Sequence, residues 1–246
     1  MATTEFVMVA PTVDPTTVSD QLLNHLRTMR WYFEKAGDER FRWICLEKQG
    51  NSSICIRIQA LVTSTDGLKK WKYFIIKTPF WGYEGLFDDE KQLKIIKGPH
   101  IIRQIDLPGN PLDQNLTIED THFPGPYTVL EYVENGSLSD LIHKAKEVGI
   151  SHLPNRLLWL IFRCLIAMCI EMEYPEAIDS DEAYDLRRIY NIWDRDPSHY
   201  HHPDLRPSHI LVGECDPDSA DHKVCPVLKL ISLGRKPHDG DLYGWT

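Results

Sequence analysis

The sequence lacks an apolar stretch long enough to cross a lipid bilayer. The longest, residues 157–170, contains Arg163 and is shorter than the roughly 18–20 residues that a membrane-spanning helix needs. The first residues also lack the basic segment and the long apolar core of a secretory signal peptide. We therefore expect a buried helix at 157–170, no membrane partner, and a cytoplasmic protein, with the nucleus as the alternative compartment.

The sequence also lacks cysteine pairs at the usual metal or redox spacing, and it has fewer basic than acidic residues. The six cysteines include no C-x-x-C pair and no spacing typical of a zinc site, so we expect free thiols rather than a disulfide or metal framework. They are Cys45, Cys55, Cys164, Cys169, Cys215 and Cys225. Asp and Glu total 36 against 27 Lys and Arg, which gives a net charge of −9. This balance argues against a general nucleic-acid binder, although a local basic groove stays open.

What remains is the composition of an ordinary globular protein, 42% hydrophobic and 26% charged. Residues 1–39 predict an N-terminal extension with an amphipathic helix. Its apolar side chains recur every three or four positions and therefore share one helical face: Val18, Leu22, Leu26, Met29 and Phe33. This face predicts packing against a core, with a partner-binding helix as the alternative.

Residues 40–133 have the pattern of a sheet with one helix. A helix at 87–97 is ended by Gly98 and Pro99 and falls between the third and fourth expected strands. We predict an α+β lobe with a five-stranded antiparallel sheet. The strands, rich in apolar and β-branched residues and bounded by turns, are expected at 42–46, 54–62, 71–77, 101–107 and 127–132.

Residues 134–246 are mainly helical. Residues 174–200, rich in Asp, Glu, Pro and Tyr, look like an insertion. The helix before them is apolar nearly all round, which is typical of a central buried helix. The expected elements are helices at 138–148 and 154–173 and short strands at 209–212 and 227–231.

The most informative segment is His202-Pro203-Asp204-Leu205-Arg206-Pro207-Ser208-His209-Ile210-Leu211-Val212. It resembles the catalytic loop of protein kinases, H-R-D-L-K-P-S-N-I-L-V, at eight of eleven positions. Residues 74–77 resemble the strand that carries the nucleotide-binding lysine, residues 127–138 resemble the hinge, and residues 227–234 end in Ser-Leu-Gly where the family has D-F-G. The resemblance covers residues 40–235, and the segment before the loop is similar to divergent kinase-like proteins of filamentous fungi.

The resemblance implies a two-lobed protein-kinase-like fold with a five-stranded N-lobe at 40–133 and a truncated, mainly helical C-lobe at 134–246. Twelve residues follow Gly234, so we expect no activation segment and no later C-lobe helix after the D-F-G position. Such a C-lobe would expose apolar surface. We therefore expect either a homodimer or capping by the helix in residues 1–36 and by the insertion.

The resemblance also implies which residues would bind a cofactor such as ATP or another nucleotide. Lys77 would neutralise phosphate oxygens. Asp89 on the following helix would hold that lysine in place, with the neighbouring Glu90 as the alternative. Gly50 is the only glycine of the family's phosphate loop that is kept, so nucleotide binding is expected to be weak. The backbone of Glu131 and Val133 would contact the nucleotide.

The catalytic residues are altered in the same comparison. Asp204 keeps the position of the catalytic base, and Arg206 replaces a lysine with the charge preserved. His209 and Ser232 replace the metal-binding Asn and Asp, and neutral imidazole and hydroxyl groups are poor magnesium ligands compared with carboxylate oxygen. No magnesium site is expected here. The alternative is a transition-metal site built from His199, His201, His202 and His209.

Three functions stay open. The first is a pseudokinase-type binding module without conventional magnesium-dependent protein phosphorylation, which holds an unknown ligand in the cleft between the lobes and retains Asp204 to bond the loop backbone. The second is an enzyme that uses Asp204, Arg206 and Lys77 for another group transfer, such as adenylyl or aminoacyl transfer in a fungal biosynthetic pathway. The third is an atypical small-molecule kinase. The replacement of both metal ligands favours the first.

Overall fold

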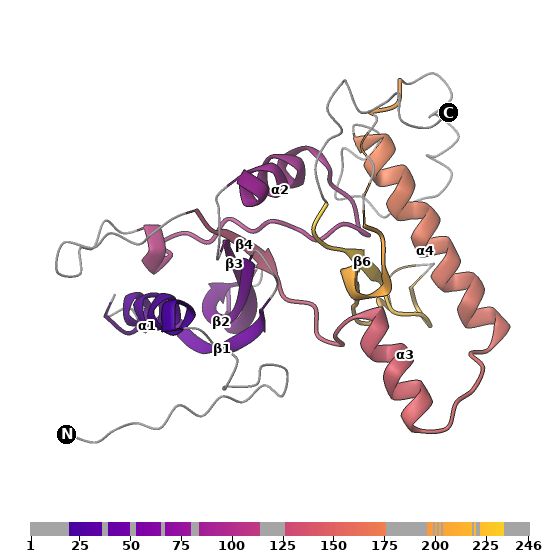
Figure 1. Cartoon of the computed structure of the whole chain (residues 1–246), viewed down its shortest axis with the longest axis horizontal. Helices are drawn as coiled ribbons and strands as arrows, with labels where there is room; N and C mark the ends of the chain where they lie inside the picture. The colour runs from indigo at the N-terminus through magenta and orange to yellow at the C-terminus, as the bar shows by residue number, and fades with distance from the viewer. Residues whose placement is uncertain are drawn as a thin grey trace. The chain divides into compact units, whose positions relative to one another are not determined.

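The computed structural model of the chain describes residues 20–35, 39–49, 53–64, 67–79, 84–113 and 126–175, and then 196–198, 200, 202, 204–217, 219 and 222–233. The chain divides into two compact units (Figure 1). Unit 1 comprises Met1–Phe87 and Gln104–Tyr132, and unit 2 comprises Asp88–Arg103 and Val133–Thr246. In the described segments, no helix combines the length and the apolar character needed to span a bilayer.

A four-stranded antiparallel sheet forms the centre of unit 1, in the order β1-β2-β3-β4. Its strands are β1 (Phe41–Gln49), β2 (Ser53–Thr63), β3 (Lys69–Pro79) and β4 (Thr128–Glu131). Strand β2 shows why the sheet forms: every second side chain, Ile54, Ile56, Ile58 and Ala60, is buried on one face. That alternation matches the two-residue period of a strand with one face against a core.

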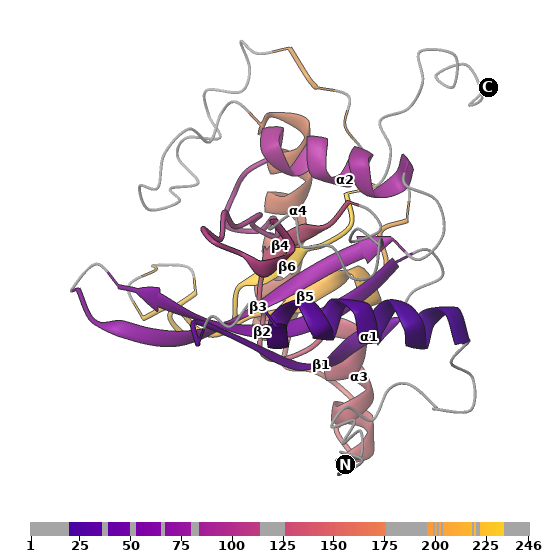
Figure 2. The ribbon, with the colours of Figure 1, turned by 90° about the vertical axis from the view of Figure 1, so that its left-hand side faces the viewer.

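Helix α1 (Asp20–Lys35) covers this buried face (Figure 2). Four of its side chains, Leu22, Leu26, Met29 and Phe33, are buried and belong to one core with the sheet. They are the described members of the apolar face that the spacing predicts, so the interpretation of α1 as a packing helix is confirmed.

The fifth strand expected at residues 101–107 is not formed, and the prediction of a five-stranded sheet is wrong for the described residues. Ile101 makes a single parallel bridge to Leu230 in unit 2, and Gln104 makes a single antiparallel bridge to Leu130 in unit 1. A strand needs consecutive residues that bond the same neighbour. This segment changes its neighbour between Ile101 and Gln104 and so forms two bridges instead.

Unit 2 combines helices with one short strand pair. Its elements are α2 (Glu84–Ile95, which starts in unit 1), α3 (Leu138–Glu147), α4 (Asn155–Glu173), β5 (Ile210–Val212) and β6 (Leu228–Leu230). Helix α3 begins with a capping box, in which Ser137 and Asp140 bond each other's backbone N–H groups. Strands β5 and β6 pair antiparallel. They match the two short strands expected near the end of the chain.

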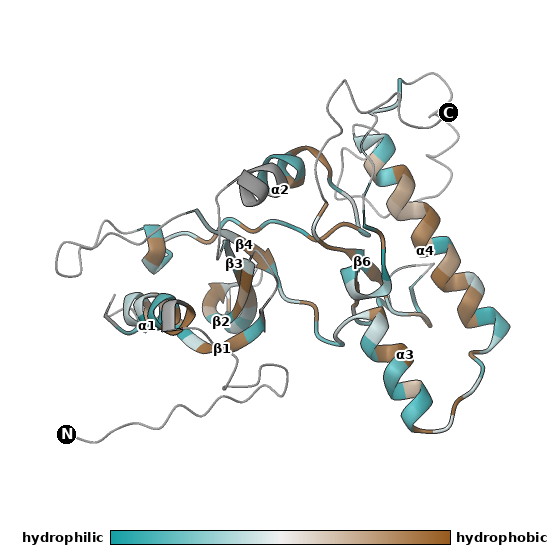
Figure 3. Ribbon diagram, in the orientation of Figure 1, coloured by the Kyte–Doolittle hydropathy of each residue, from teal (hydrophilic) through white to brown (hydrophobic). Residues whose placement is uncertain are grey.

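Helix α4 is not buried all round, which corrects the expectation of a central buried helix. One face buries Cys164, Ala167, Met168, Glu171 and Met172. Apolar residues continue along most of α4 (Figure 3), and one of them, Trp159, is 69% exposed. Apolar residues on every side indicate a preference for burial but cannot show which side the fold covers. The expectation that the exposed side is covered either by a second copy of the chain or by the helix of residues 1–36 and the insertion of residues 174–200 stays a prediction. Most of the insertion lies outside the described residues.

The chain is therefore an α+β protein with a four-stranded antiparallel sheet in unit 1 and three helices and a short strand pair among the described residues of unit 2. All six cysteines lie in the described residues, and none of them forms a disulfide there; Cys45, Cys164 and Cys225 are buried.

The core of unit 1 makes a stability prediction. Ile58 is fully buried between the sheet and α1, so Ile58→Ala leaves a cavity. We expect the free energy of unfolding of unit 1 to fall by about 2–5 kcal/mol in a urea titration. Ile44→Ala is the matched control, because Ile44 lies in the same sheet but is 36% exposed. Equal losses in the two variants would contradict this description of the core.

Candidate functional site

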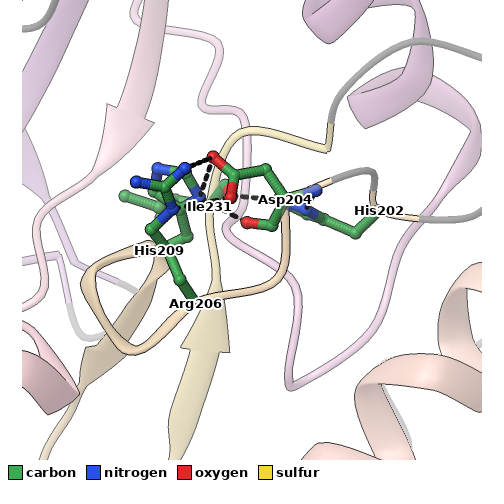
Figure 4. Close-up of polar contacts among 5 residues, drawn as sticks. All are labelled: His202, Asp204, Arg206, His209 and Ile231. Atoms are coloured by element: carbon green, nitrogen blue, oxygen red, sulfur yellow. Dashed lines mark hydrogen bonds and ion pairs between the residues drawn. The ribbon is translucent and has the colours of Figure 1, made fainter.

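The candidate site is the loop that precedes β5 and carries the kinase-like motif (Figure 4). A short 3-10 helix, Pro207–His209, leads from the loop directly into the strand. The backbone N–H of Ile231 donates to the carbonyl oxygen of His209 at 2.9 Å, and Ile210 pairs with Leu230. Because Ile210 and Leu230 are buried, the core of unit 2 fixes this end of the loop.

His202 joins the start of the loop to the end of β6. Its Nδ1 accepts the backbone N–H of Asp204 at 3.0 Å, and its Nε2 lies 3.3 Å from the carbonyl oxygen of Ile231. An Nδ1 that accepts carries no proton, so Nε2 is the protonated nitrogen and donates to Ile231. Burial lowers the pKa of His202, against the opposing effect of the Ile231 carbonyl. The neutral imidazole ring of His202 therefore links the start of the loop to the residue after β6.

Asp204 and Arg206 form a two-pronged ion pair. Arg206 Nε donates to Asp204 Oδ1 at 2.6 Å, and Nη2 lies 2.5 Å from Oδ2. This hydrogen bond and the guanidinium charge lower the pKa of the Asp204 carboxyl. The Asp204 side chain is 44% exposed and that of Arg206 is 60% exposed, so water and salt screen the pair. A carboxylate held in this way is a weak proton acceptor.

His209 bonds the loop backbone. Its Nδ1 lies 2.8 Å from the carbonyl oxygen of Asp204, and because a carbonyl only accepts, Nδ1 carries the proton. Its distance to the Asp204 Oδ2 is 3.8 Å. The expectation that the Asp204 carboxylate bonds the loop backbone is therefore reversed. His202 and His209 bond the backbone of Asp204, whereas its carboxylate contacts the side chain of Arg206.

Ser232 comes directly after Ile231, the residue whose carbonyl His202 bonds. The backbone of Ser232 has an uncommon conformation. Its φ is 60°, and among the described residues it is the one non-glycine residue with a positive φ. This left-handed conformation is uncommon for residues other than glycine and costs about 1 kcal/mol. Ser232 stands where the resemblance has a magnesium-binding carboxylate, and its hydroxyl offers magnesium no negative charge.

The other expected site residues fall in different places. Lys77 lies in β3 in register with Cys55 and Thr128, and Glu131 ends β4 opposite Phe74, all in unit 1. Val133 belongs to unit 2, where its side chain lies near Gly213. The structure brings Asp204 and Arg206 together in unit 2, and Lys77 and Glu131 lie in the same sheet of unit 1.

Some of the expected site residues lie outside the part of the chain that the structure describes. Gly50, His199 and His201 lie outside the described residues, and the same holds for the side chain of Asp89 on α2. The carboxylate next to Asp89 belongs to Glu90 and forms an ion pair with Lys94 of the same helix at 2.6 Å. Of the four histidines in the alternative metal site, only His202 and His209 are described, and their ring centres lie 5.6 Å apart.

An apolar pocket of about 600 Å³ lies beside the loop in unit 2. Its wall is formed mostly by α4, and His202 and Leu205 bring the loop to its edge. Aliphatic and sulfur-containing side chains such as Met168 and Met172 suit an apolar group rather than a phosphate. The pocket could hold an apolar ligand next to the loop.

Glu171 is a buried carboxyl group that the sequence interpretation missed. Its Oε2 accepts the backbone N–H of His100 at 3.0 Å, and it lies so close to Gly98 that a Cβ there would collide with it. Burial raises the pKa of Glu171 to about 8, against the opposing effects of the His100 N–H and Lys229. The available signal was a glutamate directly after the apolar stretch of residues 157–170, inside the helix expected at 154–173.

The comparison with known proteins assigns the described site to no family. No family model matches the sequence, and no curated protein matches it. The resemblance to protein kinases therefore depends on the quoted residues alone and stays a prediction.

The Asp204–Arg206 pair makes a prediction about titration. Arg206→Ala removes both donors, so the pKa of Asp204 should rise toward its ordinary value. Carbon NMR of the side-chain carboxyl group as a function of pH measures this change. Arg156→Ala, which removes an exposed arginine at the start of α4, should leave the titration of Asp204 unchanged. The same pKa in all three proteins would show that Arg206 does not set it.

Glu171 makes a prediction about stability and pH. Its folded-state pKa lies above its ordinary value, so the folded state holds an extra proton and stability falls as the pH rises to about 8. Between pH 6.5 and 8 this loss amounts to roughly 1–2 kcal/mol. In Glu171→Gln the loss should disappear from urea titrations over this range. Glu147→Gln, which removes an exposed carboxylate, should keep it, and an unchanged slope in Glu171→Gln would refute the assignment.

Proposed function

We propose that the chain is a kinase-like protein that binds a ligand without transferring phosphate with magnesium. The proposal includes a two-lobed kinase-like fold, with unit 1 as the N-lobe and unit 2 as the C-lobe. Two features support it. The chain contains the segments of the resemblance in the family's order, and the loop of residues 202–212 runs into a short antiparallel strand pair.

The replacement of both magnesium ligands by His209 and Ser232 is the observation that carries the proposal, and the pairing of Asp204 with Arg206 agrees with it. A catalytic base must be able to accept a proton from the attacking hydroxyl group. Two guanidinium donors occupy the carboxylate oxygens of Asp204 and lower its pKa, which weakens it as a base. The nearby His209 and Ser232 supply no carboxylate for magnesium. The base and the magnesium ligands that phosphoryl transfer requires are therefore both impaired.

An adenine nucleotide is the ligand class that we propose. Lys77 supports it, because β3 is an inner strand and its register with β2 and β4 fixes the backbone at this position. A half-buried lysine on a rigid strand is suited to meet a phosphate oxygen. Because the residues for magnesium are replaced, binding should be weak and independent of the metal.

An enzyme with another group-transfer activity is the alternative, with adenylyl or aminoacyl transfer as examples. It would also need a proton acceptor or a nucleophile in the loop. The Asp204–Arg206 pair weighs against Asp204 in either role for the same reason, since both oxygens already accept charged donors. A small-molecule kinase would need the magnesium ligands as well.

The proposal predicts nucleotide binding without a metal requirement. ATP should raise the thermal unfolding midpoint of the full chain equally in magnesium and in EDTA. Calorimetry should show that Lys77→Met weakens ATP binding about tenfold or more, because a charge-assisted contact is lost. Lys72→Met, which removes an exposed lysine from the same strand, should bind as the wild type does.

Two outcomes would contradict the proposal. One is magnesium-dependent release or transfer of the ATP γ-phosphate that disappears in Asp204→Asn, because Asp204 would then act as a base. The other is the absence of any ATP-dependent shift at millimolar ATP, because the chain would then bind no nucleotide.

A further inference from the structure

Three chemically reactive side chains meet inside unit 2, away from the loop of residues 202–212. They are His100, in the segment after α2, Cys164 on the buried face of α4, and His222, in the segment between β5 and β6. All three are buried, with exposed fractions of 2%, 2% and 8%. One donor atom from each lies within 4.8 Å of the other two. Over the described residues, no other group of three such side chains is this close.

The surrounding backbone holds His100 in an orientation that suits a ligand. Its Nδ1 lies 2.9 Å from the carbonyl oxygen of Leu228, so Nδ1 carries the proton and Nε2 keeps a lone pair. Its backbone N–H donates to Glu171, and its backbone carbonyl accepts the N–H of Leu230 at 2.7 Å. A hydrogen bond from the far ring nitrogen to a carbonyl is the usual way in which proteins orient a metal-binding histidine.

His222 is fixed independently. Its backbone N–H donates to the Ser219 hydroxyl at 3.2 Å, and its carbonyl accepts the N–H of Asp216 at 3.0 Å. Its ring centre lies 5.1 Å from that of His100, with 64° between the ring planes. Two imidazoles at an angle can direct nitrogens to one point, whereas two parallel stacked rings cannot.

We propose that His100, Cys164 and His222 bind a zinc ion that ties α4 to the segments on either side of it in unit 2. This site lies beyond the proposed nucleotide-binding function and does not depend on it.

The donor set selects the metal. Two imidazole nitrogens and one thiolate sulfur suit zinc and other late transition metals, whereas magnesium and calcium prefer oxygen ligands. His100 presents the lone pair of Nε2, because its Nδ1 donates to the Leu228 carbonyl. Zinc accepts four ligands in a tetrahedron, so these three leave one position for water or for a further side chain.

The spacing agrees with such a site after a small contraction. With zinc–nitrogen distances of about 2.0 Å and a zinc–sulfur distance of about 2.3 Å, donors on a tetrahedral ion lie roughly 3.3–3.8 Å apart. The observed limit of 4.8 Å requires the distances between donor atoms to shorten by at most about 1.5 Å.

The experiment uses the full chain, freed of metal with EDTA and then titrated with zinc against a chromophoric chelator. We expect one zinc ion per chain, bound with submicromolar affinity, and an unfolding midpoint that rises by about 5 °C or more. Cys164→Ser and His222→Gln should each weaken binding at least about tenfold. Cys45→Ser is the matched control, because it removes a buried thiol from unit 1 and should bind zinc as the wild type does.

A second measurement keeps the test decisive if a variant fails to fold. Cobalt(II) substituted into the wild-type chain should give a thiolate-to-metal charge-transfer band, and X-ray absorption of the zinc form should show one sulfur and two imidazole nitrogens. A shell of oxygen atoms, or the absence of stoichiometric zinc, would overturn the proposal. So would zinc binding that survives in a folded His222→Gln but is lost in His209→Ala, because the metal would then belong to the loop histidines.

Discussion

Strand β6 is the element on which both sites of unit 2 depend. The backbone N–H of Leu230 donates to the carbonyl of His100, and its carbonyl accepts the N–H of Ile102. Leu230 also pairs with Ile210 of β5. One end of the strand therefore fixes the ring of His100 through the Leu228 carbonyl. The other end fixes His202 through Ile231. Because Leu228 and Leu230 are almost fully buried, these contacts are tied to the core of the unit.

The two sites differ in their dielectric surroundings, and this difference decides what each can do. The Asp204–Arg206 pair is about half exposed, so solvent screens it and it contributes little to folding. Its effect is local: it holds a charged loop in one geometry and lowers the basicity of Asp204. The His100, Cys164 and His222 cluster is buried, where an ion would be shielded from water and its bonds to ligands would resist competition.

Local periodicity made part of the fold predictable from the sequence. The face of α1 around Met29 and the alternation of Ile54, Ile56 and Ile58 in β2 follow from spacing alone, because burial of one face imposes that spacing. The prediction of a fifth strand was wrong because a strand forms only where a neighbouring strand is available, and the local sequence does not show which neighbour a segment will have. The prediction that α4 is buried all round was wrong as well. The composition of a helix shows which side chains favour burial, but it does not show which other parts of the chain cover them.

The site was predictable to the same limited extent. The loop motif placed Asp204 next to Arg206, two positions away, and their pairing followed from opposite charges at short range. The roles of His202 and His209 did not follow, because each bonds a backbone atom that only the folded loop brings near. His100, Cys164 and His222 belong to three distant segments, so no spacing rule for metal sites could join them. Sequence motifs detect ligands carried by one turn or one hairpin, whereas a ligand set built on strand β6 emerges only when the core has formed.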